Sequence, residues 1–164
     1  MGNRAVIIAE DAHGYIPPVG IYLHWCGGYT CVAGWLAYCR MVGFRSPDAD
    51  NYGWARMAQV MGNTFDNGRV SDGLSLGIIS VPDAFVNIPD RTDEKLEEVL
   101  SQGDNGIYII RDWKIVHHIG GYESDKKLGA DHLRAVLEEI DEMQPWHVPK
   151  EDMDKFIAEH GEEY

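Results

Sequence analysis

Three cysteines and a histidine lie close together in one stretch of the chain, and these are residue types that bind metals or act as nucleophiles. The stretch GIYLHWCGGYTC, residues 20 to 31, holds His24, Cys26 and Cys31, and Cys39 follows eight positions later. Structural zinc sites usually take their ligands as close pairs from two opposed elements. The spacing H-x-C-x4-C-x7-C differs from that pattern, and the periodicity places Cys39 on the buried side of a helix. We therefore expect three reduced thiols and no metal site.

A cysteine nucleophile is the second chemistry that this stretch suggests. A thiol near the N-terminus of a helix ionises easily, and a neighbouring histidine would serve as its base. Gly27 interrupts the strand that carries His24, so His24 and Cys26 are not expected to share a face. The chain also lacks a Walker loop and a G-x-G-x-x-G fingerprint after a strand. The sequence thus predicts no catalytic residue and no cofactor, and an enzyme is the less favoured interpretation.

A second group of residues suggests a ligand site without pointing to a reaction. The hexapeptide NYGWAR holds Tyr52, Trp54 and Arg56 near the start of a helix, where backbone N–H groups face outward. Together with His24 and Trp25, these side chains would line a pocket for a planar or anionic ligand. The alternative is that Trp54 packs in the core and that Arg56 makes a surface ion pair.

The elements that position these residues predict an α+β domain. Apolar runs predict strands at residues 4–10, 20–25, 74–81, 106–112 and 113–119. Helical periodicity predicts helices that begin at Thr30, at Asp50 or Asn51, at Thr92, at Ser124 or Asp125, and at Pro149. Strands and helices do not alternate as βαβ units, so we expect an antiparallel sheet with packed helices.

Alternation along the second strand predicts which side chains face the core. Leu23 and Trp25 share one face and are expected to pack against Trp35 of the following helix. Tyr22 and His24 share the opposite face, where a ligand would reach them.

Length and composition indicate one globular domain. A chain of 164 residues, 45% of them hydrophobic, is long enough to bury a core of its own. The 14 Lys and Arg stand against 27 Asp and Glu, a net charge of −13 that argues against binding to nucleic acid or anionic membranes. The apolar run at residues 5–9 is too short for a signal peptide or a membrane span. We expect a cytoplasmic protein.

The negative charge is concentrated towards the C-terminus. Residues 1–121 are predicted to form a sheet-rich core, whereas residues 122–164 are predicted to form acidic helices with 13 Asp or Glu against five Lys or Arg. Such a surface would offer carboxylates where a nucleic-acid-binding enzyme expects phosphates, or it would only keep the protein in solution. The carboxylates expected on the outer helix faces are Glu138, Asp141, Glu142, Glu151 and Asp154.

Several motifs in order resemble a family of small, uncharacterised proteins. They are MGNRAVI, GIYLHW-x-GG, NYGWAR-x2-QV-x-GN and DNG-x-YII-x2-W-x-IV, and they span residues 1 to 120. Similar proteins are encoded by phages, prophages and mobile elements of Gram-positive bacteria. In that family Asn usually stands at the position of Cys26, and this departure argues further against zinc and thiol chemistry. The resemblance implies no activity. It implies that the protein is encoded alongside phage accessory proteins, among which inhibitors of host defence are common.

Two hypotheses arise from the sequence. The leading one is a non-enzymatic, phage-type inhibitor that binds a host protein, such as a CRISPR effector or another defence nuclease, through the acidic helices. The second is a small-ligand or nucleotide-signal binding protein, or an enzyme, that uses the His24, Trp25, Tyr52, Trp54 and Arg56 cluster. The sequence leaves the oligomeric state open.

Overall fold

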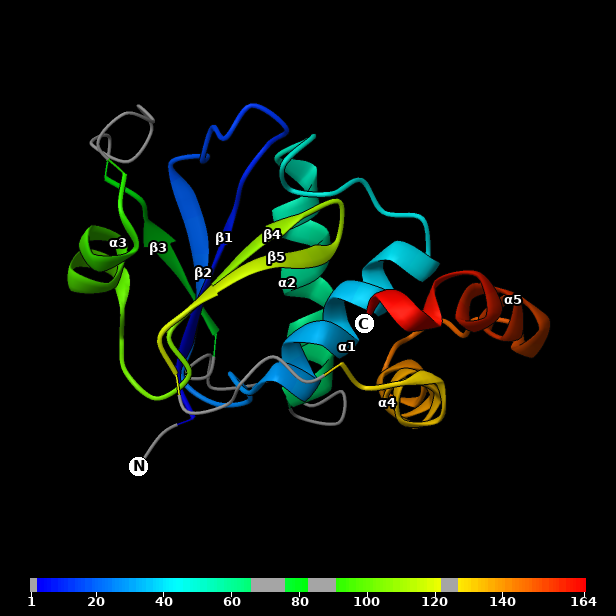
Figure 1. Cartoon of the computed structure of the whole chain (residues 1–164). Coiled ribbons are helices and arrows are strands. Elements are labelled where there is room, and N and C mark those ends of the chain that lie inside the picture. Colours follow the sequence, from blue (N-terminus) through cyan, green and yellow to red (C-terminus); the bar gives the residue numbers. More distant parts are fainter. Residues whose placement is uncertain (1–2, 66–75, 83–90, 122–126) are drawn as a thin grey trace.

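A five-stranded sheet forms the centre of the fold, with the strand order β3-β2-β1-β4-β5 (Figure 1). In this computed structural model, residues 3–65, 76–82, 91–121 and 127–164 are described. The strands are β1 (Ala5–Ala9), β2 (Val19–Leu23), β3 (Leu76–Ser80), β4 (Ile107–Arg111) and β5 (Lys114–Ile119). All five predicted strands are present, and residues 74 and 75 of the third lie outside the described ranges.

The sheet is mostly antiparallel. β1 pairs with β4 in parallel, and the other three neighbouring pairs are antiparallel. The predicted antiparallel sheet is therefore confirmed for three of the four neighbouring pairs, and β1 with β4 is the parallel exception. β1 lies in the middle of the sheet, and its sequence AVIIA is buried at every position. A continuous apolar run is what a strand covered on both faces requires, because neither set of alternating side chains meets water.

One face of the sheet is covered by a single helix, and the other face is covered by two layers of helices. α3 (Asp93–Leu100) lies on one face, where Leu96 and Leu100 pack against Val6 and Ile107. α1 (Tyr29–Met41) and α2 (Tyr52–Phe65) cover the other face, and α4 (Ala130–Glu142) and α5 (Lys150–His160) form an outer layer beyond them (Figure 1). A short 3₁₀ helix, η3 (Gly161–Glu163), ends the chain. The result is a single α+β domain, as predicted.

The outer layer is part of the same core as the sheet. Leu133 and Leu137 of α4 belong to one buried cluster with residues of α1, α2 and the sheet. A Cβ added at Gly34 of α1 would lie 2.4 Å from Val136 Cγ1, so α4 approaches α1 closely because position 34 has no side chain. The acidic C-terminal helices are thus packed elements rather than an appended tail.

Helix starts follow the predictions where a side chain caps the helix. Thr92 accepts a hydrogen bond from Lys95 N at 3.3 Å and begins α3. α1 begins at Tyr29, after Gly28 as N-cap, rather than after Thr30. The predicted starts of the fourth helix, at residues 124 and 125, lie outside the described residues. Gly129, with a φ of 76°, stands immediately before α4 and interrupts any helix from further upstream.

Trp25 corrects the prediction for the second strand. Its side chain is 45% exposed, whereas Leu23 and Trp35 are buried as expected. β2 ends at Leu23, so the strand and its alternation stop before position 25, and the chain then turns at Cys26, which has a φ of 54°. Tyr22 and His24 do lie together, since Tyr22 Oη and His24 Nδ1 are 3.0 Å apart.

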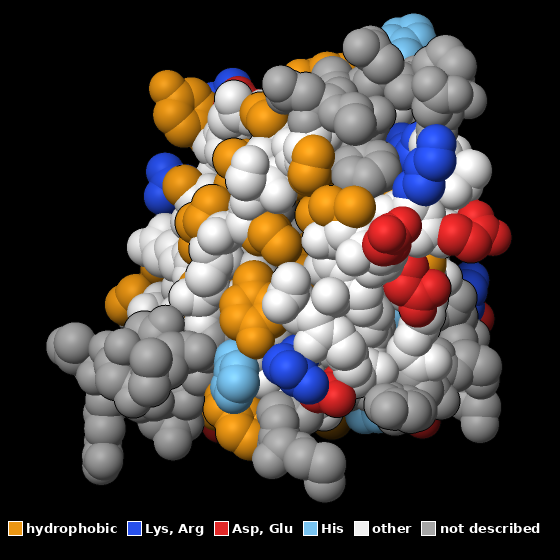
Figure 2. Space-filling model, turned by 90° about the vertical axis from the view of Figure 1, so that its left-hand side faces the viewer, with side chains coloured by type: hydrophobic (Ala, Val, Ile, Leu, Met, Phe, Trp, Pro, Cys, Tyr) orange, Lys and Arg blue, Asp and Glu red, His pale blue; other side chains and the backbone are white. Residues whose placement is uncertain are grey.

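The surface on the side of α3 and β3 is divided by chemical type. Apolar side chains gather over one part of this face and carboxylates over another (Figure 2). Ile78 on the edge strand β3 and Val99 on α3 are among the exposed large apolar residues.

Among the described helices, none has the length and apolar character needed to cross a membrane.

Candidate functional site

The five residues predicted to form a ligand pocket lie in three different places. Tyr52 and Arg56 are exposed on α2, but Trp54 is buried in the core between them. His24 and Trp25 precede the N-terminal end of α1, whereas the chain reaches α2 from the C-terminal end of α1. The 13 residues of α1 span about 20 Å at the rise of an α-helix, so the cluster is divided.

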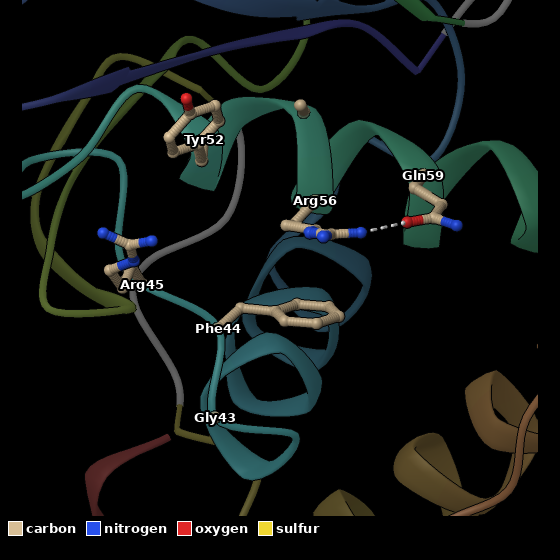
Figure 3. Close-up of a pocket in the computed structure, with 7 residues that line it drawn as sticks. Gly43, Phe44, Arg45, Tyr52, Arg56 and Gln59 are labelled. Carbon is tan, nitrogen blue, oxygen red and sulfur yellow. Dashed lines mark hydrogen bonds between the residues drawn. The ribbon is translucent and has the colours of Figure 1, made fainter.

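Tyr52 and Arg56 line a hollow together with the segment that follows α1 (Figure 3). Its volume is about 720 Å³, within the range of small-molecule sites. A second hollow of about 410 Å³ adjoins it, sharing Phe44, Arg56 and Gln59 and adding Trp146. The residues that line the larger hollow are Gly43, Phe44, Arg45, Tyr52, Ala55, Arg56 and Gln59.

Two guanidinium groups in the larger hollow lie against aromatic rings. The Cζ of Arg56 lies 5.6 Å from the centroid of the Phe44 ring, and the Cζ of Arg45 lies 5.7 Å from that of Tyr52. Figure 3 shows the Arg56 guanidinium over the Phe44 ring. Both distances are within the range of cation–π attraction. We call the hollow with Phe44, Arg45, Tyr52 and Arg56 the arginine pocket.

The two arginines differ in how their charge is balanced. Arg45 Nη1 pairs with Asp50 Oδ2 at 2.6 Å. Arg56 contacts the neutral side chain of Gln59 at 3.4 Å, and none of the described carboxylates forms an ion pair with it. The surface ion pair considered for Arg56 is therefore not found among the described residues, whereas the expected packing of Trp54 in the core is confirmed. Within the described part of the chain, Arg56 carries an uncompensated positive charge in a protein of net charge −13.

Hydrogen bonds and close packing with other parts of the fold hold the wall of the pocket in place. Trp113 Nε1 donates a 2.7 Å hydrogen bond to the carbonyl oxygen of Phe44, and Trp113 N donates to Ser46 Oγ at 3.2 Å. A Cβ added at Gly53 would lie 2.5 Å from the carbonyl oxygen of Arg45, so α2 approaches this segment with backbone against backbone. The chain around Arg45 is therefore in place before any ligand binds.

Sequence analysis missed Phe44 and Arg45 as residues of this site. Both stand in the link between two helices, where no periodicity marks a face. The available signal was Gly53 in NYGWAR, because a glycine in the first turn of a helix indicates a close approach of another backbone.

Asp141 lies inside the protein, which makes its predicted place on an outer helix face wrong. Its Oδ1 accepts hydrogen bonds from Tyr38 Oη at 2.6 Å and from Val148 N at 3.0 Å. Burial and this carboxylate together raise the pKa of Tyr38 above its usual range. The side of α4 that carries Asp141 faces α1, so this carboxylate holds two elements together.

The other predicted contact residues are on the surface. Glu138, Glu142 and Glu151 are exposed. Asp154 of α5 is half-buried and pairs with Arg134 of α4 at 2.6 Å. The outer face of α4 and α5 thus keeps several carboxylates in solvent, although Arg134 pairs with Asp154 and, at 4.0 Å, also with Glu138.

The three cysteines have different surroundings. Cys39 is fully buried among apolar residues, and this burial raises its pKa. Cys26 and Cys31 are half-buried, the first in the turn before α1 and the second in the first turn of that helix. Within the part of the chain that the structure describes, no group of three His, Cys, Asp or Glu side chains is arranged to hold a metal ion.

Comparison with known proteins gave no match to a protein-family model, to a curated protein or to a solved structure. The resemblance to phage-encoded proteins therefore stays a prediction. The function of the chain is inferred from the geometry and the charges of its own residues.

Proposed function

We propose that the protein binds a small ligand that carries both an anionic group and a planar group, in the arginine pocket. The observation that supports this most directly is Arg56, whose guanidinium is exposed, stacked on Phe44 and without a carboxylate partner among the described residues. Guanidinium groups bind phosphate or carboxylate through two parallel hydrogen bonds. The ring of Tyr52, which is 68% exposed, offers a surface on which a planar group stacks.

A nucleotide combines these two groups, and it is the ligand class we favour. Its phosphate would meet Arg56 and its base would meet the aromatic rings. A volume of about 720 Å³ accommodates a ligand of this size.

Calorimetric titration with nucleoside monophosphates, and with the corresponding nucleosides, tests this proposal. We expect the phosphates to bind and the nucleosides to bind at least tenfold more weakly, because they lack the anion that Arg56 recognises. Arg56→Gln should weaken phosphate binding by about tenfold or more, equivalent to about 1.4 kcal/mol. Arg56→Lys should restore part of the loss, since an ammonium keeps the charge without the planar fork.

The matched control is Lys150→Gln, which removes one positive charge from an exposed position at the start of α5. Binding should be unchanged in this variant. An absence of binding across the panel, or equal losses in Arg56→Gln and Lys150→Gln, would contradict a site at the arginine pocket.

We also propose a second function, which the exposed carboxylates of the outer layer favour. Glu138, Glu142 and Glu151 face solvent from a C-terminal region, residues 122–164, that holds 13 Asp or Glu against five Lys or Arg. This surface suits a host protein with a basic, nucleic-acid-binding groove. The function would be that of a phage-type, non-enzymatic inhibitor of a defence effector in the bacterial cytoplasm.

Affinity capture from a host lysate, followed by mass spectrometry, tests this second function. The wild type should retain a nucleic-acid-binding protein that is lost with a Glu142→Lys/Glu151→Lys bait and released as salt rises. The control bait is Glu94→Lys/Glu98→Lys, which reverses two exposed carboxylates on α3, across the sheet. Equal capture by all three baits would reject docking through the outer layer.

A further inference from the structure

The arginine pocket and the second hollow share Arg56. The larger hollow, of about 720 Å³, has Tyr52 on its wall, whereas the smaller one, of about 410 Å³, has Trp146. Phe44, Arg56 and Gln59 line both. Tyr52, Arg56 and Gln59 follow one another along one face of α2, and Figure 3 shows Arg56 between the other two. The guanidinium therefore stands where the two hollows meet.

Each hollow offers an aromatic ring of its own. The Tyr52 ring in the larger hollow is exposed, and it is the ring on which the proposed function places a planar group. Trp146 in the smaller hollow is half-buried and meets the Phe44 ring edge-on, with 6.5 Å between the centroids and 79° between the planes. Tyrosine and tryptophan rings both stack with nucleobases. The second hollow thus repeats the planar binding surface of the first.

The segment that carries Trp146 is held in place by α4. Trp146 lies in the link between α4 and α5, and the two residues that follow it both contact Asp141. Val148 N donates a 3.0 Å hydrogen bond to Asp141 Oδ1, and His147 Nδ1 lies 3.2 Å from the Asp141 carbonyl oxygen. The smaller hollow is therefore bounded on this side by a chain that the fold positions before any ligand binds.

The distribution of charge indicates what kind of ligand would fill both hollows. Of the described residues that line the smaller hollow, Arg56 alone is charged. In the larger hollow the other charged residue is Arg45, which Asp50 neutralises at 2.6 Å. A ligand that fills both hollows thus needs one anionic group in the middle and an uncharged planar group on either side. A mononucleotide has one base and would leave one hollow empty.

We propose that the ligand of the arginine pocket is a dinucleotide, with its bridging phosphate on Arg56, one base against Tyr52 and the other against Trp146. This inference rests on the proposed function, because it takes the anion at Arg56 from there and adds the second base and the smaller hollow. Each hollow has the volume of a small-molecule site, so each has room for one nucleoside. The single negative charge of a bridging phosphate matches the single guanidinium without a carboxylate partner among the described residues.

Calorimetric titration with adenylyl-adenosine and with the methyl ester of adenosine monophosphate tests the inference. Both ligands carry one negative charge on a phosphodiester, but the methyl ester has only one base. We expect adenylyl-adenosine to bind at least tenfold more tightly, equivalent to about 1.4 kcal/mol, because its second base stacks on Trp146. Equal affinities would overturn the inference, and the proposed function would still stand if Arg56→Gln weakened binding of both ligands. If neither ligand bound, the inference and the proposed function would both be wrong.

Substitution of Trp146 tests where the second base lies. Trp146→Leu keeps an apolar side chain at this half-buried position and removes the ring. We expect the affinity for adenylyl-adenosine to fall about tenfold, to that of the methyl ester, whereas the affinity for the methyl ester should change less than twofold. Trp146→Phe should restore part of the loss, since a ring is present again.

The matched control is Trp25→Leu, which removes an exposed tryptophan ring beyond the other end of α1. Both affinities should be unchanged in this variant, and thermal denaturation verifies that all variants are folded. Losses of equal size for the two ligands in Trp146→Leu, or no loss for either, would overturn the placement of the second base in the smaller hollow.

Discussion

The arginine pocket and the acidic outer layer carry opposite charges, and they differ in how much of that charge is free. In the pocket, Arg56 has no carboxylate partner among the described residues, and its guanidinium is exposed. In the outer layer, Asp141 is bonded to Tyr38, and Asp154 is bonded to Arg134. A high density of charge in a sequence therefore does not say which charges are available to another molecule.

Glu163 shows the same division within the acidic region. Its carboxylate accepts from Arg40 Nη1 at 2.6 Å and lies 2.9 Å from His160 Nδ1 and 3.2 Å from Lys114 Nζ. These contacts tie η3 to α1, α5 and β5. Part of the negative charge thus stabilises the fold, whereas carboxylates such as Glu142 and Glu151 face solvent.

The largest effect is expected from Asp141→Ala. The change removes two hydrogen bonds and leaves the Tyr38 hydroxyl without its acceptor in a buried position. We expect the free energy of unfolding to fall by about 3 kcal/mol, measured by urea denaturation. Glu142→Ala, at the exposed neighbouring position, should change it by less than about 0.5 kcal/mol. If the two variants were equally stable, the assignment of a structural role to Asp141 would be wrong.

A smaller effect is expected from Glu163, and it depends on pH. The hydrogen bond from Arg40, followed by those from His160 and Lys114, lowers the pKa of Glu163 from 4.5 to about 2. The carboxylate is thus more acidic in the folded protein, so its stabilisation is complete above about pH 5 and is lost as the pH falls towards 2. We expect about 1–2 kcal/mol, less than the full shift implies, because the side chain is one-third exposed to screening water.

Urea denaturation of wild type and Glu163→Gln at pH 7 and at pH 3 measures this contribution. The wild type should be the more stable protein at pH 7, and the difference should shrink at pH 3. Glu162→Gln, at an exposed neighbouring position, is the control and should show no such dependence. A difference between wild type and Glu163→Gln that is the same at both pH values would contradict the prediction.

Asp50→Asn tests how much the free positive charge in the arginine pocket contributes to ligand binding. Asp50 neutralises Arg45 through Oδ2, while its Oδ1 accepts from Tyr52 N at 2.9 Å. Asparagine keeps an oxygen for that hydrogen bond and removes the charge, so a second arginine becomes free. We expect nucleotide affinity to rise about two- to fivefold in calorimetry, as for an exposed ion pair worth less than 1 kcal/mol. A weaker affinity would mean that Arg45 does not face the bound anion.

The smallest effect is expected for the stability of Glu142→Lys/Glu151→Lys. Both positions are exposed, so reversing their charge should change the free energy of unfolding by less than about 0.5 kcal/mol per site. Thermal denaturation at two salt concentrations measures this. A loss of several kcal/mol would show that these carboxylates stabilise the fold as Asp141 does, and the contrast between buried and free carboxylates would disappear.

Local features of the fold could be predicted because they depend on neighbours in the chain. The continuous apolar run AVIIA indicates a strand buried on both faces, and β1 occupies the middle of the sheet. Thr92 caps α3 with its own hydroxyl, three residues from the amide that it binds. The parallel pairing of β1 with β4 could not be predicted in this way, because these strands are nearly 100 residues apart and their pairing depends on how the intervening elements pack.

The candidate site was predicted only in part. Tyr52 and Arg56 were identified from their types and spacing, and the structure places both at one hollow. Arg45 was missed, since it reaches the pocket through the packing of Gly53 against the chain that precedes α2. Trp25 was assigned to the core by an alternation that stops two residues earlier, at Leu23.

By itself, the sequence determined the element types, the apolar core positions of β1 and the overall excess of negative charge, because these depend on residue types and short-range periodicity. The tertiary structure decided which charges are free. Asp141 faces α1 because α4 packs there, and Arg56 has no carboxylate partner among the described residues because its neighbours in space are Phe44 and Gln59. Exposure and pairing are properties of the packed elements, and residues far apart in the chain set them.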